Sequence, residues 1–207
     1  MRSDISSLVT AQRRRLGRLV EALDETEWRG PSLYTGWCVR DVVAHCVQSH
    51  VATPSRLAVE LLAARLSLTA RNERWVAARR QHDRAMVLAE YRASADRVNV
   101  PAAELPYALT EAVVHGYDIA CPTRQPIEVP TQSLVIVADA CRRAGLFLHA
   151  RQRCAGLTLR ARDADWSAGS GPEVTGPLAS IVMAITGRPV ALDGLSGDGL
   201  DTLRSRV

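Results

Sequence analysis

The hydrophobic positions in the first part of the chain recur with the period of an α-helix. Apolar residues between positions 4 and 24 are three or four apart, which places them on one helix face. Ser3 or Asp4 can cap the start of this helix, because their side chains accept hydrogen bonds from backbone amides. The apolar face consists of Ile5, Leu8, Val9, Leu16, Leu19, Val20 and Leu23.

After a connector over 27–35, the same periodicity predicts three more helices. The first runs from about residue 38 to residue 53. The second begins at Pro54, which suits the first turn of a helix, and continues to about residue 66. The third covers about 82–98, whereas the arginine-rich stretch that precedes it has no clear period.

Residues 106–120 are predicted to form a largely buried helix. Only Ala and Val separate Glu111 from His115, so polar residues are few in this run. We expect the helix to stop before Pro122. The prolines at 122, 126 and 130 favour extended backbone, which makes this stretch the best domain boundary.

Beyond residue 130 the hydrophobic pattern changes. Leu157, Leu159 and Ala161 alternate with Thr158, Arg160 and Arg162, as in a strand with one buried face. The turn at 169–171 separates two shorter strands. In order, the pattern predicts a helix over 131–149, strands over 156–163, 164–168 and 173–175, a helix over 178–186 and a short terminal helix.

These elements predict an α+β protein with a helical domain over 1–126 and a small α+β domain over 127–207. Hydrophobic residues form 47% of the 207 residues, which is enough for a real core. No uninterrupted apolar run reaches the roughly 18 residues of a membrane span, and the first residues lack the apolar centre of a signal peptide. We therefore expect a cytoplasmic protein with no membrane partner.

All 26 basic residues are arginines, and the net charge is +4. Clusters such as Arg13-Arg14-Arg15 could bind nucleic acid. They alternate with acidic residues, however, and no aromatic residues are interleaved with them. We favour solvated helix faces and expect no nucleic-acid partner.

The five cysteines, at 38, 46, 121, 141 and 154, include no C-x-x-C pair. Their odd number argues against a disulfide framework and against a zinc ribbon. We expect reduced thiols, most of them buried, and no cysteine nucleophile. Cys38 is the one to test, because it lies near a helix start, where the helix dipole can lower the pKa of a thiol.

Two helical segments carry the candidate chemistry. Glu111 and His115 are four residues apart and share a helix face, and a buried carboxylate needs a partner or a metal. His45 ends another apolar run and can supply a third ligand, as a divalent ion requires. Together they suggest a metal held between helices of a bundle. The alternative is that both histidines are hydrogen-bonded core residues.

Three sequence blocks resemble the mycothiol-dependent maleylpyruvate isomerase family. Gly36-Trp-Cys-Val-Arg-Asp-Val-Val-Ala-His45 is similar to its G-W-x-V-x-D-V-x-A-H signature, and Glu111-Ala-Val-Val-His-Gly-Tyr-Asp118 to its E-x-x-x-H-G-[WY]-D block. The third block covers 165–177 and continues through 186–189. We align nothing between 66 and 105. The resemblance implies a DinB-like four-helix bundle that holds a divalent metal, usually zinc, followed by a small α+β C-terminal domain.

Carried over residue by residue, the resemblance implies that His45, Glu111 and His115 are the metal ligands. Asp41 matches a motif position one helical turn before His45, where it can orient a ligand or cap its own helix. Asp118, three residues after His115, can orient that histidine or simply lie exposed at the end of its helix.

Arg188 matches the Gly-Arg of the third block and is expected to act in catalysis and cofactor binding. Its planar guanidinium suits a carboxylate of the substrate or cofactor, although it can also be a surface arginine. Two His and one Glu leave one metal position open, as in catalytic zinc sites. The resemblance points to mycothiol as the thiol that is activated there, so the expected function is isomerisation or S-transfer on a small electrophilic substrate.

Two other functions stay open. One is a non-catalytic module that binds a metal or a thiol. The other is a metal-independent relative with a different small-molecule reaction.

Overall fold

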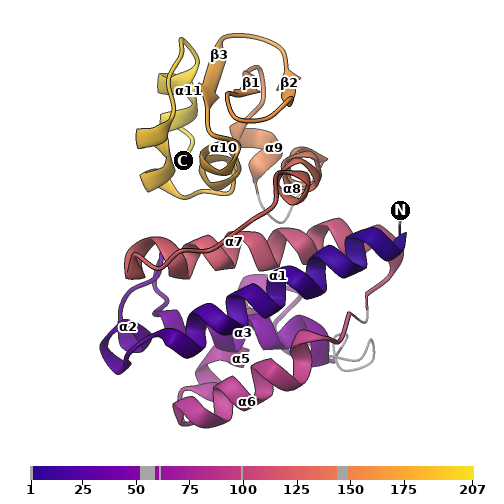
Figure 1. The fold of residues 1–207 in the computed structure, drawn as a ribbon, viewed down its shortest axis with the longest axis vertical. Coiled ribbons are helices and arrows are strands. Elements are labelled where there is room, and N and C mark those ends of the chain that lie inside the picture. Colours follow the sequence, from indigo (N-terminus) through magenta and orange to yellow (C-terminus); the bar gives the residue numbers. More distant parts are fainter. Residues whose placement is uncertain (1, 52–58, 61, 99, 144–148) are drawn as a thin grey trace. The chain divides into compact units, whose positions relative to one another are not determined.

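The computed structural model describes residues 2–51, 59–60, 62–98, 100–143 and 149–207 (Figure 1). The chain divides into two compact units. The first comprises Met1–Ala108 with His115–Ile127, and the second comprises Leu109–Val114 with Glu128–Val207. The helix over Leu105–Thr123 therefore contributes residues to both units.

The predicted α+β class is confirmed, with a mostly helical N-terminal region followed by a small mixed sheet and further helices. The helices before the sheet region are α1 (Arg2–Ala22), α2 (Glu25–Arg29), α3 (Val39–Val51), α5 (Leu68–Arg79), α6 (Arg84–Ala95), η1 (Ala102–Glu104) and α7 (Leu105–Thr123). The remaining elements are α8 (Thr131–Arg143), α9 (Ala150–Arg153), β1 (Thr158–Ala161), β2 (Ser167–Gly169), β3 (Glu173–Gly176), α10 (Leu178–Ile185), η2 (Pro189–Gly194) and α11 (Leu200–Arg204). Among the described residues, no helix combines the length and the apolar character that crossing a membrane requires.

In the first unit, α3 packs against α5 and α6, and α1 packs against α6 (Figure 1). The predicted apolar face supplies four buried residues of α1, Val9, Leu16, Leu19 and Val20, and Leu23 is buried just after the helix. Valines of α3 belong to the same hydrophobic core, and Val39, Val42 and Val43 are fully buried. The 3.6-residue period of the sequence therefore marks the core side of both helices.

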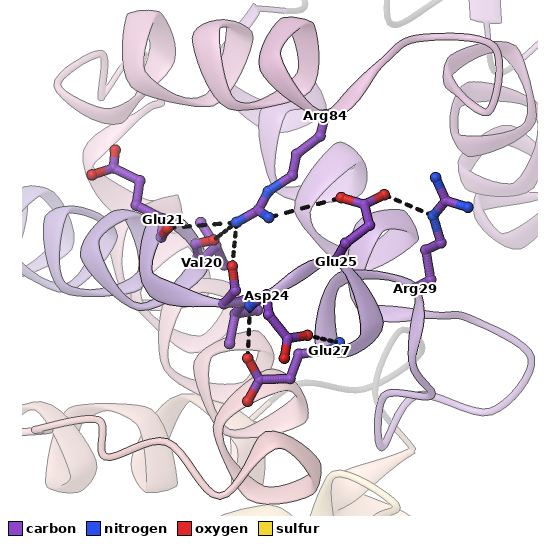
Figure 2. Close-up of polar contacts among 8 residues, drawn as sticks. Val20, Glu21, Asp24, Glu25, Glu27, Arg29 and Arg84 are labelled. Carbon is purple, nitrogen blue, oxygen red and sulfur yellow. Dashed lines mark hydrogen bonds and ion pairs between the residues drawn. The ribbon is translucent and has the colours of Figure 1, made fainter.

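An additional short helix, α2, begins at Glu25, before the predicted connector over 27–35, and ends inside it at Arg29. Asp24 caps it, since the Asp24 carboxylate accepts the Glu27 amide at 2.8 Å while the Glu27 carboxylate accepts the Asp24 amide. Arg84 of α6 donates hydrogen bonds to the carbonyls of Val20 and Leu23 just before this turn (Figure 2). A capping box and one arginine thus define a sharp corner after α1.

The arginine-rich stretch without a clear period forms α5. Ser67 caps it, and Trp75 and Val76 face the core. The guanidinium of Arg79 lies 3.4 Å above the centre of the Trp75 ring, so a charged residue covers apolar surface. The helix predicted to begin at Pro54 lies largely outside the described residues.

Helix α7 continues past Pro122, although it was predicted to stop before this residue. A proline in the last turn removes only one helical hydrogen bond, the one to the carbonyl of residue i−4, which is Asp118. That carbonyl instead accepts the backbone N–H of Leu33 at 3.0 Å. The helix ends at Thr123, and the residue after it, Arg124, adopts the left-handed conformation with φ 54°.

In the second unit the three strands are ordered β2-β1-β3, with β2 antiparallel and β3 parallel to β1. Leu159 and Ala161 are buried whereas Arg160 is exposed, as the alternation predicts. Helix α10 packs against β1, β3 and α8. The predicted helix over 131–149 ends at Arg143, residues 144–148 lie outside the described residues, and α9 is a separate helix.

Candidate functional site

Two histidines meet inside the first unit. His45 lies on α3 and His115 on α7, and their ring centres are 5.0 Å apart with an interplanar angle of 84°. His115 is buried and His45 is half-buried. His45 ends the first sequence block and His115 lies in the second, so these two blocks, far apart in the sequence, are adjacent in the fold.

Asp118 fixes the orientation of the His115 ring. Its carboxylate lies 2.9 Å from Nδ1 of His115 and is fully buried, not exposed at the helix end. An ionised carboxylate can only accept, so Nδ1 carries the hydrogen of this bond. In the neutral ring, Nε2 then keeps its lone pair and can bind a metal or a proton.

A short loop between α2 and α3 places two aromatic rings beside the histidines. The Tyr34 ring is 6.2 Å from His115, and the Trp37 ring is 5.2 Å from His45. Tyr34 and Trp37 also contact each other at 4.4 Å. The four rings form a closed cycle, which we call the four-ring cluster.

Backbone bonds hold this loop in place. The Ser32 hydroxyl and amide both donate to the Trp37 carbonyl, and Gly36 turns the chain with φ 83°, a conformation that favours glycine. The bond from the Leu33 amide to the Asp118 carbonyl ties the loop to α7. Asp118 therefore positions both His115, through its side chain, and the loop that carries Tyr34, through its backbone.

The other predicted site residues of the helices are placed differently. Glu111 is half-buried and lies one turn before His115 on α7. Asp41 is buried, and its carboxylate accepts two hydrogen bonds from Arg80, at 3.1 and 3.4 Å. Within the ranges that the structure describes, no group of three or more His, Cys, Asp or Glu side chains is arranged to hold a metal. Of the three predicted ligands, the structure therefore brings His45 and His115 together.

Arg188 belongs to the second unit, where it follows α10 and is buried. Its guanidinium donates to the Thr186 carbonyl at 2.6 Å. Burial and the nearby positive charge of Arg188 lower the pKa of the Arg153 guanidinium. Two arginines therefore concentrate positive charge at this end of α10.

The cysteines are free thiols, but fewer are buried than predicted. Cys46 and Cys141 are buried, Cys38 and Cys154 are half-buried, and Cys121 is exposed. Burial raises the pKa of Cys38, which outweighs the lowering by the Asp41 backbone amide at the start of α3. Burial also raises the pKa of Cys121 and Cys154, and that of Cys141 to about 12. At neutral pH these four thiols are protonated and poorly nucleophilic.

The sequence reasoning missed the two aromatic residues of the four-ring cluster as parts of the site. Trp37 follows the glycine of the first matched block, and this placement was the available signal. Tyr34 lies three residues earlier and outside the block, so nothing in the motif marks it.

Comparisons with known proteins agree with this fold. Residues 9–108 match the family model described as the mycothiol maleylpyruvate isomerase N-terminal domain, and the match includes the segment 66–105 that the blocks left unaligned. The structure of the mycothiol-dependent maleylpyruvate isomerase is similar with a TM-score of 0.69 and 18% identity, over 96% of this chain and 93% of that one. A mutant of that enzyme aligns with the same TM-score and coverage at 19% identity. No curated protein sequence matches the chain significantly.

Proposed function

Because residues 9–108 of this chain match the family model of the mycothiol maleylpyruvate isomerase N-terminal domain, we propose that the protein is a metal-dependent enzyme that uses mycothiol. The substrate would be a small electrophilic molecule with a carboxylate, and the reaction an isomerisation by thiol addition or a thiol transfer. The observation that carries this proposal is the approach of the His45 and His115 rings to 5.0 Å between α3 and α7.

The proposed metal ligands are His45, Glu111 and His115, with zinc as the ion that the family resemblance implies. Both imidazoles suit such an ion, and Asp118 holds His115 in the tautomer whose Nε2 can bind it. Glu111 shares the helix face of His115, since it lies four residues earlier on α7. A zinc ion bound there would lower the pKa of a thiol at its remaining position.

The residues around the histidines would prepare the site for this chemistry. Asp118 would keep the hydrogen on Nδ1 of His115, and the Tyr34 and Trp37 rings lie beside the two imidazoles, where they would limit access of water. The raised thiol pKa values described above make an intrinsic cysteine nucleophile unfavourable. An external thiol is therefore the better source of the reacting sulfur.

We further propose that Arg188 binds an anionic group of the substrate or of the thiol cofactor. Its guanidinium is already oriented by the Thr186 carbonyl, and the positive charge of Arg153 lies nearby. Arg188→Lys should weaken binding, because lysine lacks the planar fork that pairs with a carboxylate. A KM that is unchanged in this variant contradicts the assignment.

The proposed function is tested by metal content and thiol-dependent turnover of the purified protein. We expect about one zinc per chain, none in His115→Ala, and affinity weakened about tenfold in Asp118→Asn, which loses the carboxylate charge behind the imidazole. His149→Ala is the matched control, because His149 is an exposed histidine of the second unit. Full zinc occupancy in His115→Ala contradicts the ligand assignment.

Turnover is then measured with mycothiol and a panel of carboxylated electrophiles. The variant with all five cysteines replaced should stay active and remain dependent on the added thiol. Loss of activity in Cys38→Ala alone, with metal bound and the fold intact, indicates a cysteine nucleophile instead. Metal binding without any turnover identifies a non-catalytic module, and turnover without metal identifies a metal-independent relative.

A further inference from the structure

The second unit contains a small pocket beside the first strand of its sheet. Its volume is about 260 Å³. Arg142 of α8 and Arg151 of α9 line one part of it, and Cys154 and the backbone around Gly156 and Gly169 line the rest. No acidic residue is among those that line it.

Arg142 differs in its bonding from two other arginines of the second unit. Arg143, the next residue after Arg142, makes an ion pair with Asp139, and Arg160 makes one with Glu173 at 2.7 Å. Arg142, in contrast, has a buried Nε atom with no hydrogen-bond partner within the described part of the chain. A buried N–H donor without an acceptor is unfavourable, so the described residues leave part of the hydrogen-bonding capacity of the Arg142 guanidinium unused.

From these features we infer that the pocket binds a small dianion, either a phosphate group or a compact dicarboxylate. Two guanidinium groups supply two positive charges and several N–H donors in planar forks, which match oxyanions. The pocket holds no carboxylate that would neutralise them. This inference rests only on the second unit and is independent of the proposed thiol chemistry.

Cys154 provides a reporter inside the same pocket. Burial raises its pKa, whereas the positive charges of Arg142 and Arg206 act in the opposite direction. The thiol is therefore mostly protonated at neutral pH, and its alkylation proceeds slowly through the small thiolate fraction. A bound anion should cover it and slow its alkylation, while the exposed Cys121 supplies an internal reference.

The test measures alkylation of Cys154 relative to Cys121 by mass spectrometry, in the full-length protein at constant ionic strength. Inorganic phosphate and succinate are titrated separately, with acetate as a monoanion control. We expect saturable protection of Cys154 by at least one dianion and none by acetate. Stronger protection by phosphate assigns the phosphate class, and stronger protection by succinate assigns the dicarboxylate class.

Two variants make the test specific to the pocket. Arg142→Gln should weaken dianion binding about tenfold, since a charge-assisted pair is lost. The matched control Arg143→Gln, one residue away and outside the pocket lining, should bind as the unchanged protein does. If Arg142→Gln is poorly folded, Arg151→Gln replaces it, because Arg151 is exposed. Absence of protection, or equal binding by all variants, overturns the inference.

Discussion

The two units of this protein fill their interiors in different ways. The first unit buries Gln12, Arg13, Gln48, His115 and Asp118 among its helices. In the second unit the residues without exposed surface are apolar, among them Val174, Leu178, Ile181 and Val182, and the buried polar residues Thr110, Ser133, Thr186 and Arg188 keep between 1% and 6% of their surface exposed. Buried polar groups stabilise a fold less than apolar residues of the same size do, so the complete burial of Gln12 and Asp118 in the first unit points to a use beyond folding.

Arg13 illustrates how the first unit accommodates a charge. It is the first member of the Arg13-Arg14-Arg15 cluster, yet its guanidinium donates to the carbonyls of Ala95 and Cys46 and to the Ser94 hydroxyl. The Tyr91 hydroxyl donates to the Arg13 carbonyl at 2.9 Å. A residue that looked like solvated surface therefore links α1, α3 and α6.

The largest expected effect is in the second unit, on replacing Ile181 by Ala. Ile181 is fully buried in α10, so the variant loses apolar contact and leaves a cavity, at about 4 kcal/mol of unfolding free energy. Hydrogen exchange measured by mass spectrometry should place the loss in peptides from 156–203. Val190→Ala, at an exposed position of the same unit, should change little. If Ile181→Ala lowers the unfolding free energy only slightly, the proposed difference between the two units is contradicted.

In the first unit, Arg13→Ala should cost about 3 kcal/mol, because several hydrogen bonds from one buried cation are lost together. Urea unfolding of this variant measures the change. Arg14→Ala is the matched control, since Arg14 makes an exposed ion pair with Asp96 and should matter far less. Equal losses in the two variants mean that the buried position of Arg13 has no special role.

The next effect in size is a change of the unfolding free energy with pH, which we expect from Cys141 of the second unit. Cys141 keeps its proton in the folded state up to a pKa of about 12, whereas an unfolded chain loses it near the ordinary value of 9.0. The folded state therefore binds more protons above pH 9, and stability falls as the pH rises towards 12. Relative to Cys141→Ala, the unchanged protein should lose about 1.4 kcal/mol between pH 8 and 10. Parallel stability curves for the two proteins contradict this.

The smallest expected effect is at the corner between α1 and α2. Asp24→Ala removes one half of the capping box drawn in Figure 2 and should lower the unfolding free energy by about 1 kcal/mol. Thermal unfolding compares it with Thr26→Ala, an exposed change in the same helix. If both variants have the same midpoint, the corner is held by Arg84 and not by the cap.

The contrast between the units also explains what the sequence could predict. In the second unit, alternating apolar residues predicted β1, because polar residues there do lie outside. Hydrophobic periodicity did not predict α5, because Arg71 is buried against Glu60 and Arg79 covers Trp75. Where charged residues lie inward, hydrophobic periodicity no longer marks the core face.

For the candidate site, the motifs predicted that His45 and His115 belong together, and the helices bring them together. No motif or local pattern predicts that Asp41 pairs with Arg80, or that the Leu33 amide bonds to the Asp118 carbonyl. Both contacts depend on where distant helices and loops lie, and no local propensity encodes them.

The proline in the last turn of α7 has an evolutionary consequence. The loop beside the histidines is anchored on the Asp118 carbonyl, which is available because Pro122 has no amide hydrogen to offer it. If another residue replaced Pro122, its backbone N–H would form a helical hydrogen bond to the Asp118 carbonyl. That N–H would then compete with the Leu33 amide for the same oxygen. We therefore expect residue 122 and the length of the loop that contains Leu33 to have changed together during divergence.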